Sequence, residues 1–168
     1  MTTVEQLAAA TQRIRDSAHA VGAALSAVSV YTEPTITRAV QAEQNLYRGI
    51  ETEFSLLSST DAGRLMGSRS SAPRNLAAAA HRGQALIGLR RGNQVVYPGF
   101  QFGSDGQPLP VIKRLREIAD ANGWSETALL QWLCAPTTYL DGDRPVDHLG
   151  TDPQRVAAVA ADDFSVSW

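Results

Sequence analysis

Apolar residues recur every three or four positions through the first third of the chain, which is the spacing of one helix face. One such stripe predicts an amphipathic helix over residues 3–28, and another predicts a helix from Pro34 to about Leu57. Pro34 separates them, because proline disfavours a helical residue before it and suits the first turn of a helix. The stripes consist of Val4, Leu7, Thr11, Ile14, Ala18, Val21, Leu25 and Val28, and of Ile36, Val40, Tyr47, Ile50, Phe54 and Leu57.

Two amphipathic helices of this length need other apolar surfaces to cover their stripes. The two helices can pack on each other as a hairpin within one chain, or they can form a seam between two chains. The pattern fits both arrangements. We therefore expect residues 1–55 to form a helical hairpin that can also serve as a dimerisation element.

Two short helices are predicted next, between residues 58 and 83. Ser58 or Ser59 can cap the first helix, and Gly67 can end it. Pro73 suits the first turn of the second helix, and Gly83 ends that helix. The second helix is rich in alanine, and small side chains allow two helices to cross closely, as in a helix-turn-helix.

A β-hairpin is predicted directly after these helices. Residues 85–89 and 94–97 are β-prone runs that flank a turn at residues 90–93, in which Gly92 and Asn93 can adopt a positive φ. Two short helices followed by a hairpin are typical of a winged helix-turn-helix. We assign this arrangement to residues 56–103.

The remaining residues, 104–168, predict a small helical domain. Helices are expected over 109–122 and from Ser125 to the residue before Pro136, a single helical turn over 145–149, and a last helix from 152 to about 161. The predicted fold class is therefore mainly α-helical, with a short β-hairpin in the middle of the chain.

Charge is distributed unevenly along this pattern. The chain has a formal net charge of −2, yet residues 58–102 carry six arginines against one acid, Asp61, whereas residues 103–168 carry a net charge of −5. We call residues 58–102 the basic island. Its arginines are Arg64, Arg69, Arg74, Arg82, Arg90 and Arg91.

A basic island on a winged helix-turn-helix predicts nucleic-acid binding. Arginine and asparagine can pair with base edges, and serine hydroxyls can bind phosphates. The alternative is that these arginines are ordinary solvated surface. We expect the groove-facing part of the recognition helix to consist of Arg69, Ser70, Ser71, Arg74, Asn75 and Ala78, and the wing to contact the DNA backbone through Arg90 and Arg91.

Other function classes find little support in the sequence. The single cysteine, Cys134, excludes an intramolecular disulfide framework, and His19, His81 and His148 have no metal-ligand spacing with it. Phosphate-binding glycine loops, nucleophile elbows and membrane-length apolar runs are absent. We expect a cytoplasmic protein without a cofactor, and not an enzyme.

A more specific pattern lies near the C-terminus. It consists of Trp132, Leu133, Pro136, Leu140, Gly142, Pro145, Val146, Asp147 and Leu149. This pattern resembles the C-terminal toxin-binding domain of the Xre/MbcA/ParS-type antitoxins. The sequence departs from the family at Thr137, where asparagine is usual, and at His148, where an apolar residue is usual. Trp132, Pro136, Gly142, Pro145 and Asp147 can also be explained as residues that shape a compact helical corner.

The resemblance implies an antitoxin of a type II toxin–antitoxin system. Such a protein would neutralise a RES-type, NAD-consuming toxin and, as a homodimer, would bind its own operator DNA. By the same analogy, Phe164, Val166 and Trp168 would anchor the C-terminal tail in the toxin. Two alternatives remain open at this point: a free-standing DNA-binding transcriptional regulator, and an adaptor that binds protein only.

Overall fold

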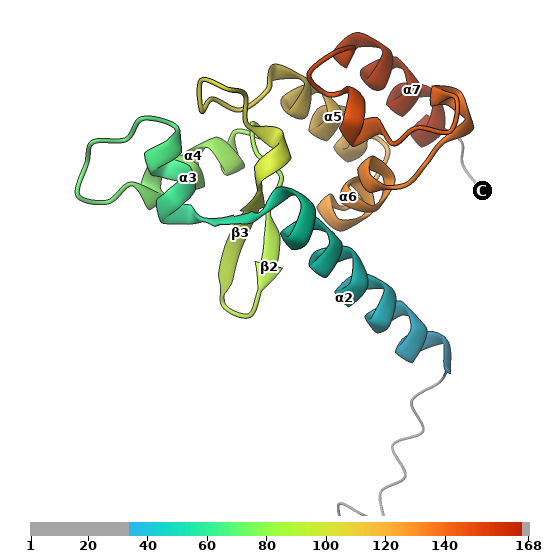
Figure 1. The fold of residues 1–168 in the computed structure, drawn as a ribbon, viewed down its shortest axis with the longest axis horizontal. Coiled ribbons are helices and arrows are strands. Elements are labelled where there is room, and N and C mark those ends of the chain that lie inside the picture. Colours follow the sequence, from blue (N-terminus) through green and yellow to red (C-terminus); the bar gives the residue numbers. More distant parts are fainter. Residues whose placement is uncertain (1–33, 166–168) are drawn as a thin grey trace, which may run out of the picture. The chain divides into compact units, whose positions relative to one another are not determined.

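The computed structural model describes residues 34–165 (Figure 1). The helix predicted over residues 3–28, and with it most of the expected helical hairpin, lies outside the described residues. From residue 43 to residue 165, the described residues form one compact unit. The expected domain boundary at residue 103 lies inside this unit.

The described residues confirm a mainly helical fold with a small three-stranded antiparallel sheet of order β1-β3-β2. None of the described helices is both long and apolar enough to cross a membrane. The elements in chain order are α2 (Pro34–Phe54), β1 (Leu56–Ser58), α3 (Ser59–Leu65), α4 (Arg74–Arg82), β2 (Leu89–Arg91), β3 (Gln94–Pro98), the 3-10 turn η1 (Gly99–Gln101), α5 (Pro110–Ala121), α6 (Glu126–Cys134), η2 (Thr138–Leu140), η3 (Pro145–His148) and α7 (Pro153–Ser165).

Strand β1 was not predicted, because its residues continue the apolar stripe of the preceding helix. The helix ends at Phe54 instead of reaching Leu57, and Ser55 adopts a left-handed φ of 64°. This reversal directs Leu57 into register with Tyr97 of the central strand. Gly99 is required here, because a Cβ at this position would collide with the Phe54 carbonyl oxygen.

Helices α3 and α4 begin and end close to the predicted positions. The Ser58 hydroxyl accepts a hydrogen bond of 3.1 Å from the Asp61 amide, and Gly67 ends the first segment with a φ of 90°. A Cβ at Gly63 would collide with the Pro73 carbonyl, so glycine allows the start of α4 to lie against α3. Close packing of the two helices follows from small side chains, as predicted.

The predicted strand over residues 85–89 is wrong in its position, since β2 begins only at Leu89. The backbone ahead of it pairs with side chains instead of a strand. The Gln101 side chain accepts a 2.7 Å hydrogen bond from the Ile87 amide and donates a 3.0 Å bond to the Ile87 carbonyl. It also donates to the Pro98 carbonyl at 3.0 Å. A glutamine thus takes the place of a neighbouring strand.

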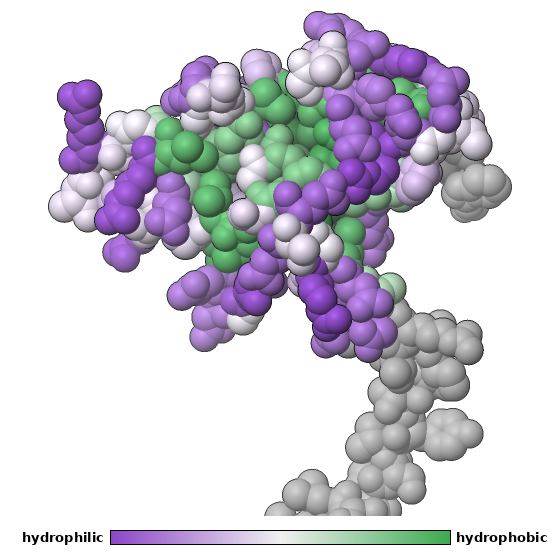
Figure 2. Space-filling model, viewed as in Figure 1, coloured by the Kyte–Doolittle hydropathy of each residue, from purple (hydrophilic) through white to green (hydrophobic). Residues whose placement is uncertain are grey.

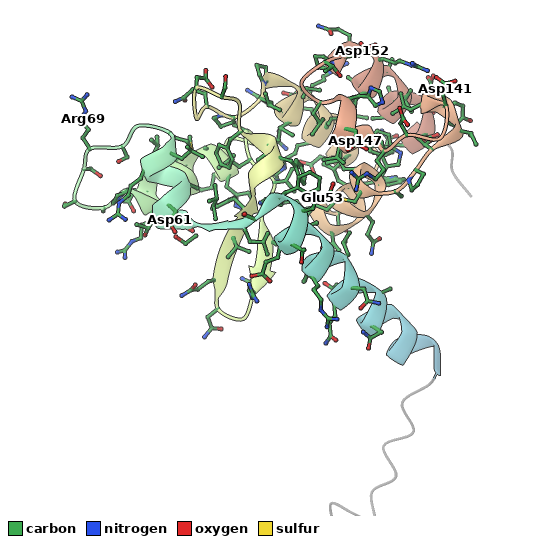
Figure 3. The ribbon with its side chains drawn as sticks, in the orientation of Figure 1. Glu53, Asp61, Arg69, Asp141, Asp147 and Asp152 are labelled. Atoms are coloured by element: carbon green, nitrogen blue, oxygen red, sulfur yellow. The ribbon has the colours of Figure 1, made fainter. Side chains whose placement is uncertain are left out.

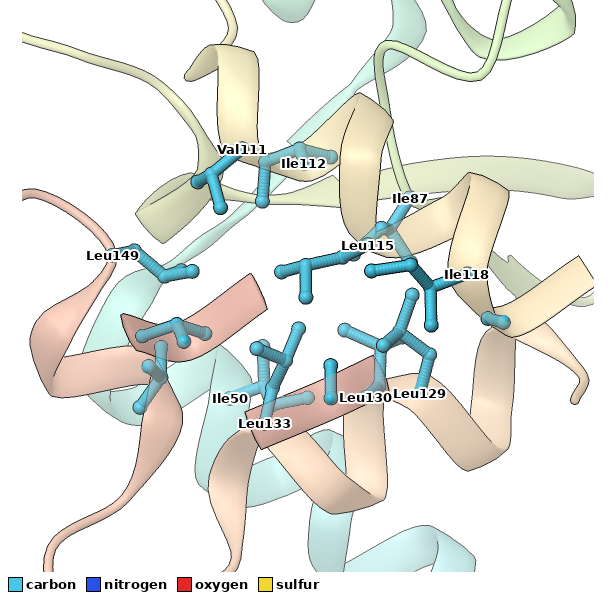
Figure 4. Close-up of a cluster of buried hydrophobic side chains, with 14 of the residues drawn as sticks. Ile50, Ile87, Val111, Ile112, Leu115, Ile118, Leu129, Leu130, Leu133 and Leu149 are labelled. Atoms are coloured by element: carbon cyan, nitrogen blue, oxygen red, sulfur yellow. The ribbon is translucent and has the colours of Figure 1, made fainter. Parts of the chain in front are cut away.

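The sheet separates two hydrophobic clusters. The smaller lies under α3 and α4 and consists of Ala62, Ala77, Leu86 and Tyr97. The larger combines residues of α2 and the sheet with α5, α6 and α7 (Figure 4). It contains Ile50, Ile87, Leu89, Val96, Val111, Ile112, Leu115, Ile118, Ala119, Leu129, Leu130, Leu133, Val146, Leu149, Val156, Ala160 and Phe164. In Figure 2, hydrophobic residues gather in the middle of the visible face of this unit, with hydrophilic residues around them.

The C-terminal helices follow their predicted caps. The Ser125 hydroxyl accepts a 3.1 Å hydrogen bond from the Ala128 amide at the start of α6, and Gly123 has a φ of 73° after α5. The last helix runs four residues beyond the predicted end near Ala161, because Phe164 adds one more buried contact to its apolar face.

Replacing Gln101 with leucine should destabilise the fold strongly. The apolar side chain would leave the amide and carbonyl of Ile87 and the carbonyl of Pro98 buried without these partners. We expect the free energy of unfolding to fall by roughly 3 kcal/mol, since each orphaned buried group costs about 1–3 kcal/mol. Urea unfolding followed by circular dichroism measures the loss. The same change at the exposed Gln154 should leave the midpoint nearly unchanged.

Candidate nucleic-acid interface

The six arginines of the basic island are all exposed, but only some of them are free to bind a ligand. Within residues 34–165, ion pairs engage Arg64, which lies 3.9 Å from Asp61, and Arg91, which lies 2.7 Å from Glu51 on α2. The other four make no ion pair within these residues; they are Arg69, Arg74, Arg82 and Arg90. Figure 3 shows Arg69 at the outer edge of the loop between α3 and α4.

A hollow of about 450 Å³ lies between α4 and the β2–β3 hairpin. Helix α4 lines it with residues that recur at helical spacing, and the hairpin lines it with polar residues near the turn and an aromatic ring deeper in. The lining residues are Ser58, Ser59, Thr60, Arg74, Ala78, His81, Arg82, Asn93, Gln94, Val95 and Tyr97. Two arginines therefore face the same hollow as the hairpin.

Two predicted contact residues, Arg74 and Ala78, line this hollow, and Asn75 is exposed beside them on α4. Arg82 was not among the predicted contact residues, yet it lines the hollow one further turn along the helix. The spacing of four residues from Arg74 through Ala78 to Arg82 is a signal that could have identified it. Asn93 and Gln94 were not predicted either, because only the folded hairpin brings them opposite α4.

The predicted assignment of residues 69–71 to the recognition helix is wrong, since α4 begins at Arg74. These residues form the loop before the helix. The Ser70 hydroxyl accepts a hydrogen bond of 3.2 Å from the Ala72 amide, which shapes the loop locally. All three residues, Arg69, Ser70 and Ser71, remain exposed on the side of the unit that carries α4.

Arg90 and Arg91 lie in strand β2, whereas the sequence placed them in the turn. The turn itself is formed by Gly92, with a φ of 61°, and Asn93. Successive strand residues point to opposite faces of a sheet, and the two arginines differ in their partners. Arg91 pairs with Glu51, and its charge is balanced there. Arg90 makes no ion pair within residues 34–165.

The orientation of α4 is fixed by a cluster of charged side chains behind it. The Nε2 atom of His81 lies 2.9 and 3.0 Å from the two carboxylate oxygens of Glu126 on α6. Arg116 of α5 donates to Glu126 at 2.7 Å and to the His81 carbonyl at 3.0 Å. Its side chain is only 10% exposed. The cluster thus connects the last turn of α4 to α5 and α6.

Glu126 is held in its charged form by this cluster. Burial is the largest single influence and raises the pKa of its carboxyl group. Hydrogen bonds from His81 and the Gly88 amide, with the charge of Arg116 and, when its ring is protonated, that of His81, outweigh burial, so that the pKa is lowered overall. Gly88 is required at this position, since a Cβ would lie 2.9 Å from His81 Nε2 and 2.7 Å from a Val95 methyl group.

The residues of the C-terminal motif form a compact corner. Gly142 has a φ of 93°, Pro136 follows the end of α6, and Pro145 is buried at the start of η3. Asp147 accepts two hydrogen bonds from Arg144, at 2.9 and 2.7 Å. These bonds are the largest influence on the carboxyl group and lower its pKa.

Arg144 also connects this corner to α2. Its guanidinium donates to both carboxylate oxygens of Glu53, at 2.9 and 2.7 Å, and lies over the ring of Phe54 at 5.9 Å from the centroid. Nearby, burial raises the pKa of the Cys134 thiol to about 11, which keeps it protonated and weakly nucleophilic. Arg144 thus holds the corner against the end of α2.

Phe164 is not an exposed tail anchor, as the resemblance implied. It is only 3% exposed, and its ring stacks on Trp124 at 4.0 Å and meets Trp132 edge-on at 5.0 Å between centroids. The Trp132 indole N–H donates to Asp163 at 2.9 Å, which fixes the end of α7. The extended α7 thus places Phe164 in the hydrophobic core. Val166 and Trp168 lie outside the described residues.

Replacing Glu126 with glutamine should lower stability at neutral pH by about 2 kcal/mol, because it leaves a buried guanidinium without its carboxylate. The folded pKa of Glu126 is lowered, so its contribution is present above the unfolded pKa near 4 and is lost as the pH falls through the folded value. The difference from wild type should therefore shrink below about pH 4. Thermal unfolding from pH 7 to pH 3 measures this. Glu117→Gln, at an exposed site on α5, is the matched control.

Comparison with known proteins gives one informative similarity. No protein-family model matches the chain, and no curated protein matches it. Among solved structures, the chain is similar to the NMR structure of Rv2175c, with 26% sequence identity and a TM-score of 0.57. The matched region covers 67% of this chain and 82% of that one. The similarity concerns the fold and assigns no activity.

Proposed function

We propose that this protein binds double-stranded DNA through α4 and the β2–β3 hairpin, in the manner of a winged helix-turn-helix. The observation that carries the proposal is the hollow between the two elements. Arg74 and Arg82 line it from the helix, and Asn93 and Gln94 line it from the hairpin. Both arginines lack an ion pair within residues 34–165, so their charge is available to phosphates.

The division of contacts follows from the exposed side chains. Arg74 and Asn75 lie in the first turn of α4, and these residue types can pair bidentately with guanine and adenine edges. Arg82 and the unpaired Arg90 suit the phosphate backbone, which fixes register without reading sequence. The exposed loop residue Arg69 adds a further positive charge on the same side.

The biological role that best fits this surface is transcriptional regulation. The cluster around Glu126 supports it, because it holds α4 rigidly against α5 and α6 and so presents its outer face in one orientation. A homodimer that reads a palindromic operator would follow from two-fold symmetry. Dimerisation through residues 1–55 stays a prediction from the helical stripes.

Arg74→Ala and Arg82→Ala should each weaken binding to duplex DNA, and each should lower the slope of log K against log salt by about one unit. The reason is that each arginine neutralises one phosphate and releases its counterion. Fluorescence anisotropy over a salt series measures the slope. Arg114→Ala, at an exposed site on α5, provides the matched control and should leave the slope unchanged. Unaltered slopes in both hollow variants would contradict the proposal.

Toxin neutralisation by the C-terminal segment stays a prediction from the antitoxin resemblance. The placement of Phe164 changes how it must be tested, because a truncation that removes this residue would open the hydrophobic core. Ending the chain after Ser165 removes Val166 and Trp168 and keeps Phe164. If the tail neutralises a RES-type toxin, this truncation should restore NAD loss in cells that express the toxin, whereas Asp162→Asn in the full chain should not. Full protection by the truncated chain would exclude a tail-based mechanism.

A further inference from the structure

His81 occupies an unusual position for a histidine that holds two helices together. The residue lines the hollow between α4 and the hairpin, while its Nε2 atom lies within hydrogen-bond distance of both oxygens of Glu126. A carboxylate only accepts hydrogen bonds, so Nε2 must carry the hydrogen in both the neutral and the charged ring. Glu126 therefore fixes the tautomer.

The other ring nitrogen then depends on protonation. Within residues 34–165, Nδ1 of His81 makes no hydrogen bond. With Nε2 fixed as the donor, Nδ1 of the neutral ring can only accept, and it carries a lone pair that a phosphate oxygen would repel. Only the protonated ring offers an N–H donor to a phosphate. A phosphate in the hollow would therefore select the charged form.

The charged groups around the ring also favour the protonated ring once DNA is bound. Glu126 from α6 is negative, whereas Arg116 from α5 and Arg82 and Arg74 from α4 are positive. Tyr97 from β3 meets the ring edge-on at 5.8 Å between centroids. In the free protein, the positive charges of the arginines disfavour a proton on the His81 ring. Phosphates bound by these arginines would neutralise their charges and so remove this repulsion.

We propose that His81 is a DNA-contact residue that captures a proton when the hollow binds the phosphate backbone. The inference rests on the proposed function and adds a linkage between DNA affinity and pH. Imidazole is the side chain that changes charge most readily between pH 5 and 8. Duplex binding should therefore tighten as the pH falls from 8 to 6, by at most about tenfold per pH unit, which is the limit for one coupled proton.

Isothermal titration of a duplex into the full chain, in buffers of different ionisation enthalpy, counts the protons taken up. Wild type should take up as much as one proton near neutral pH, and His81→Asn should lose most of this uptake. His148→Asn is the matched control, because His148 also pairs with a carboxylate, that of Asp143 at 3.0 Å, but does not line the hollow. It should behave as wild type.

The possible outcomes separate this inference from the proposed function. If wild type binds DNA without proton uptake, or His81→Asn retains the uptake, the inference is wrong and DNA binding stands. If wild type binds no duplex at low salt at either pH, both fail. Should His81→Asn not fold, the histidine ring resonances of the wild-type protein decide the matter. Adding DNA must change the pH dependence of the His81 resonances, and an unchanged pH dependence overturns the inference.

Discussion

The nearly buried guanidinium of Arg116 connects three segments of this protein through its hydrogen bonds. Arg116 is only 10% exposed, and a buried charge is tolerated only when its donors are satisfied. Its partners are the carboxylate of Glu126, the carbonyl of His81 and the carbonyl of Leu86. They belong to α6, to the end of α4 and to the segment ahead of β2. Satisfying one charge therefore fixes the relation of all three segments.

The parts of the fold that could be predicted from the sequence are those with local causes. The caps at Ser58 and Ser125 and the glycine after α5 act within a few residues. Such helix ends can be predicted from neighbouring residues in the sequence. Strand β1 and the irregular segment 86–88 escaped prediction. Their hydrogen-bond partners are distant in sequence, and a three-residue strand has too few positions to show a period of two.

The candidate site divides in the same way. Arg74, Asn75 and Ala78 could be identified because helical spacing and charge indicated an exposed face on one helix. Asn93 and Gln94 could not, since the hollow exists only where the folded hairpin stands opposite that helix. The burial of Phe164 escaped prediction for a related reason: a short apolar tail and the last turn of a buried helix have the same sequence pattern.

Segments that the sequence presented as separate domains share one interior. Ile87 of the middle segment, Ile50 of α2 and Leu130 of α6 belong to the same hydrophobic cluster. The basic and acidic segments consequently belong to one compact unit. Such a unit has an electric dipole, which orients it before contact, so that its basic side approaches a negatively charged partner first.

The pairing of Gln101 with the main chain of Ile87 has a consequence for evolution. A contact between a side chain and a backbone places no demand on the identity of the residue that supplies the backbone. Relatives of this protein should therefore retain an amide at position 101 while position 87 varies among apolar residues. Covariation between the two columns of an alignment would be weak, although their atoms are in direct contact. Contact inference from alignments would overlook one of the bonds on which this fold depends.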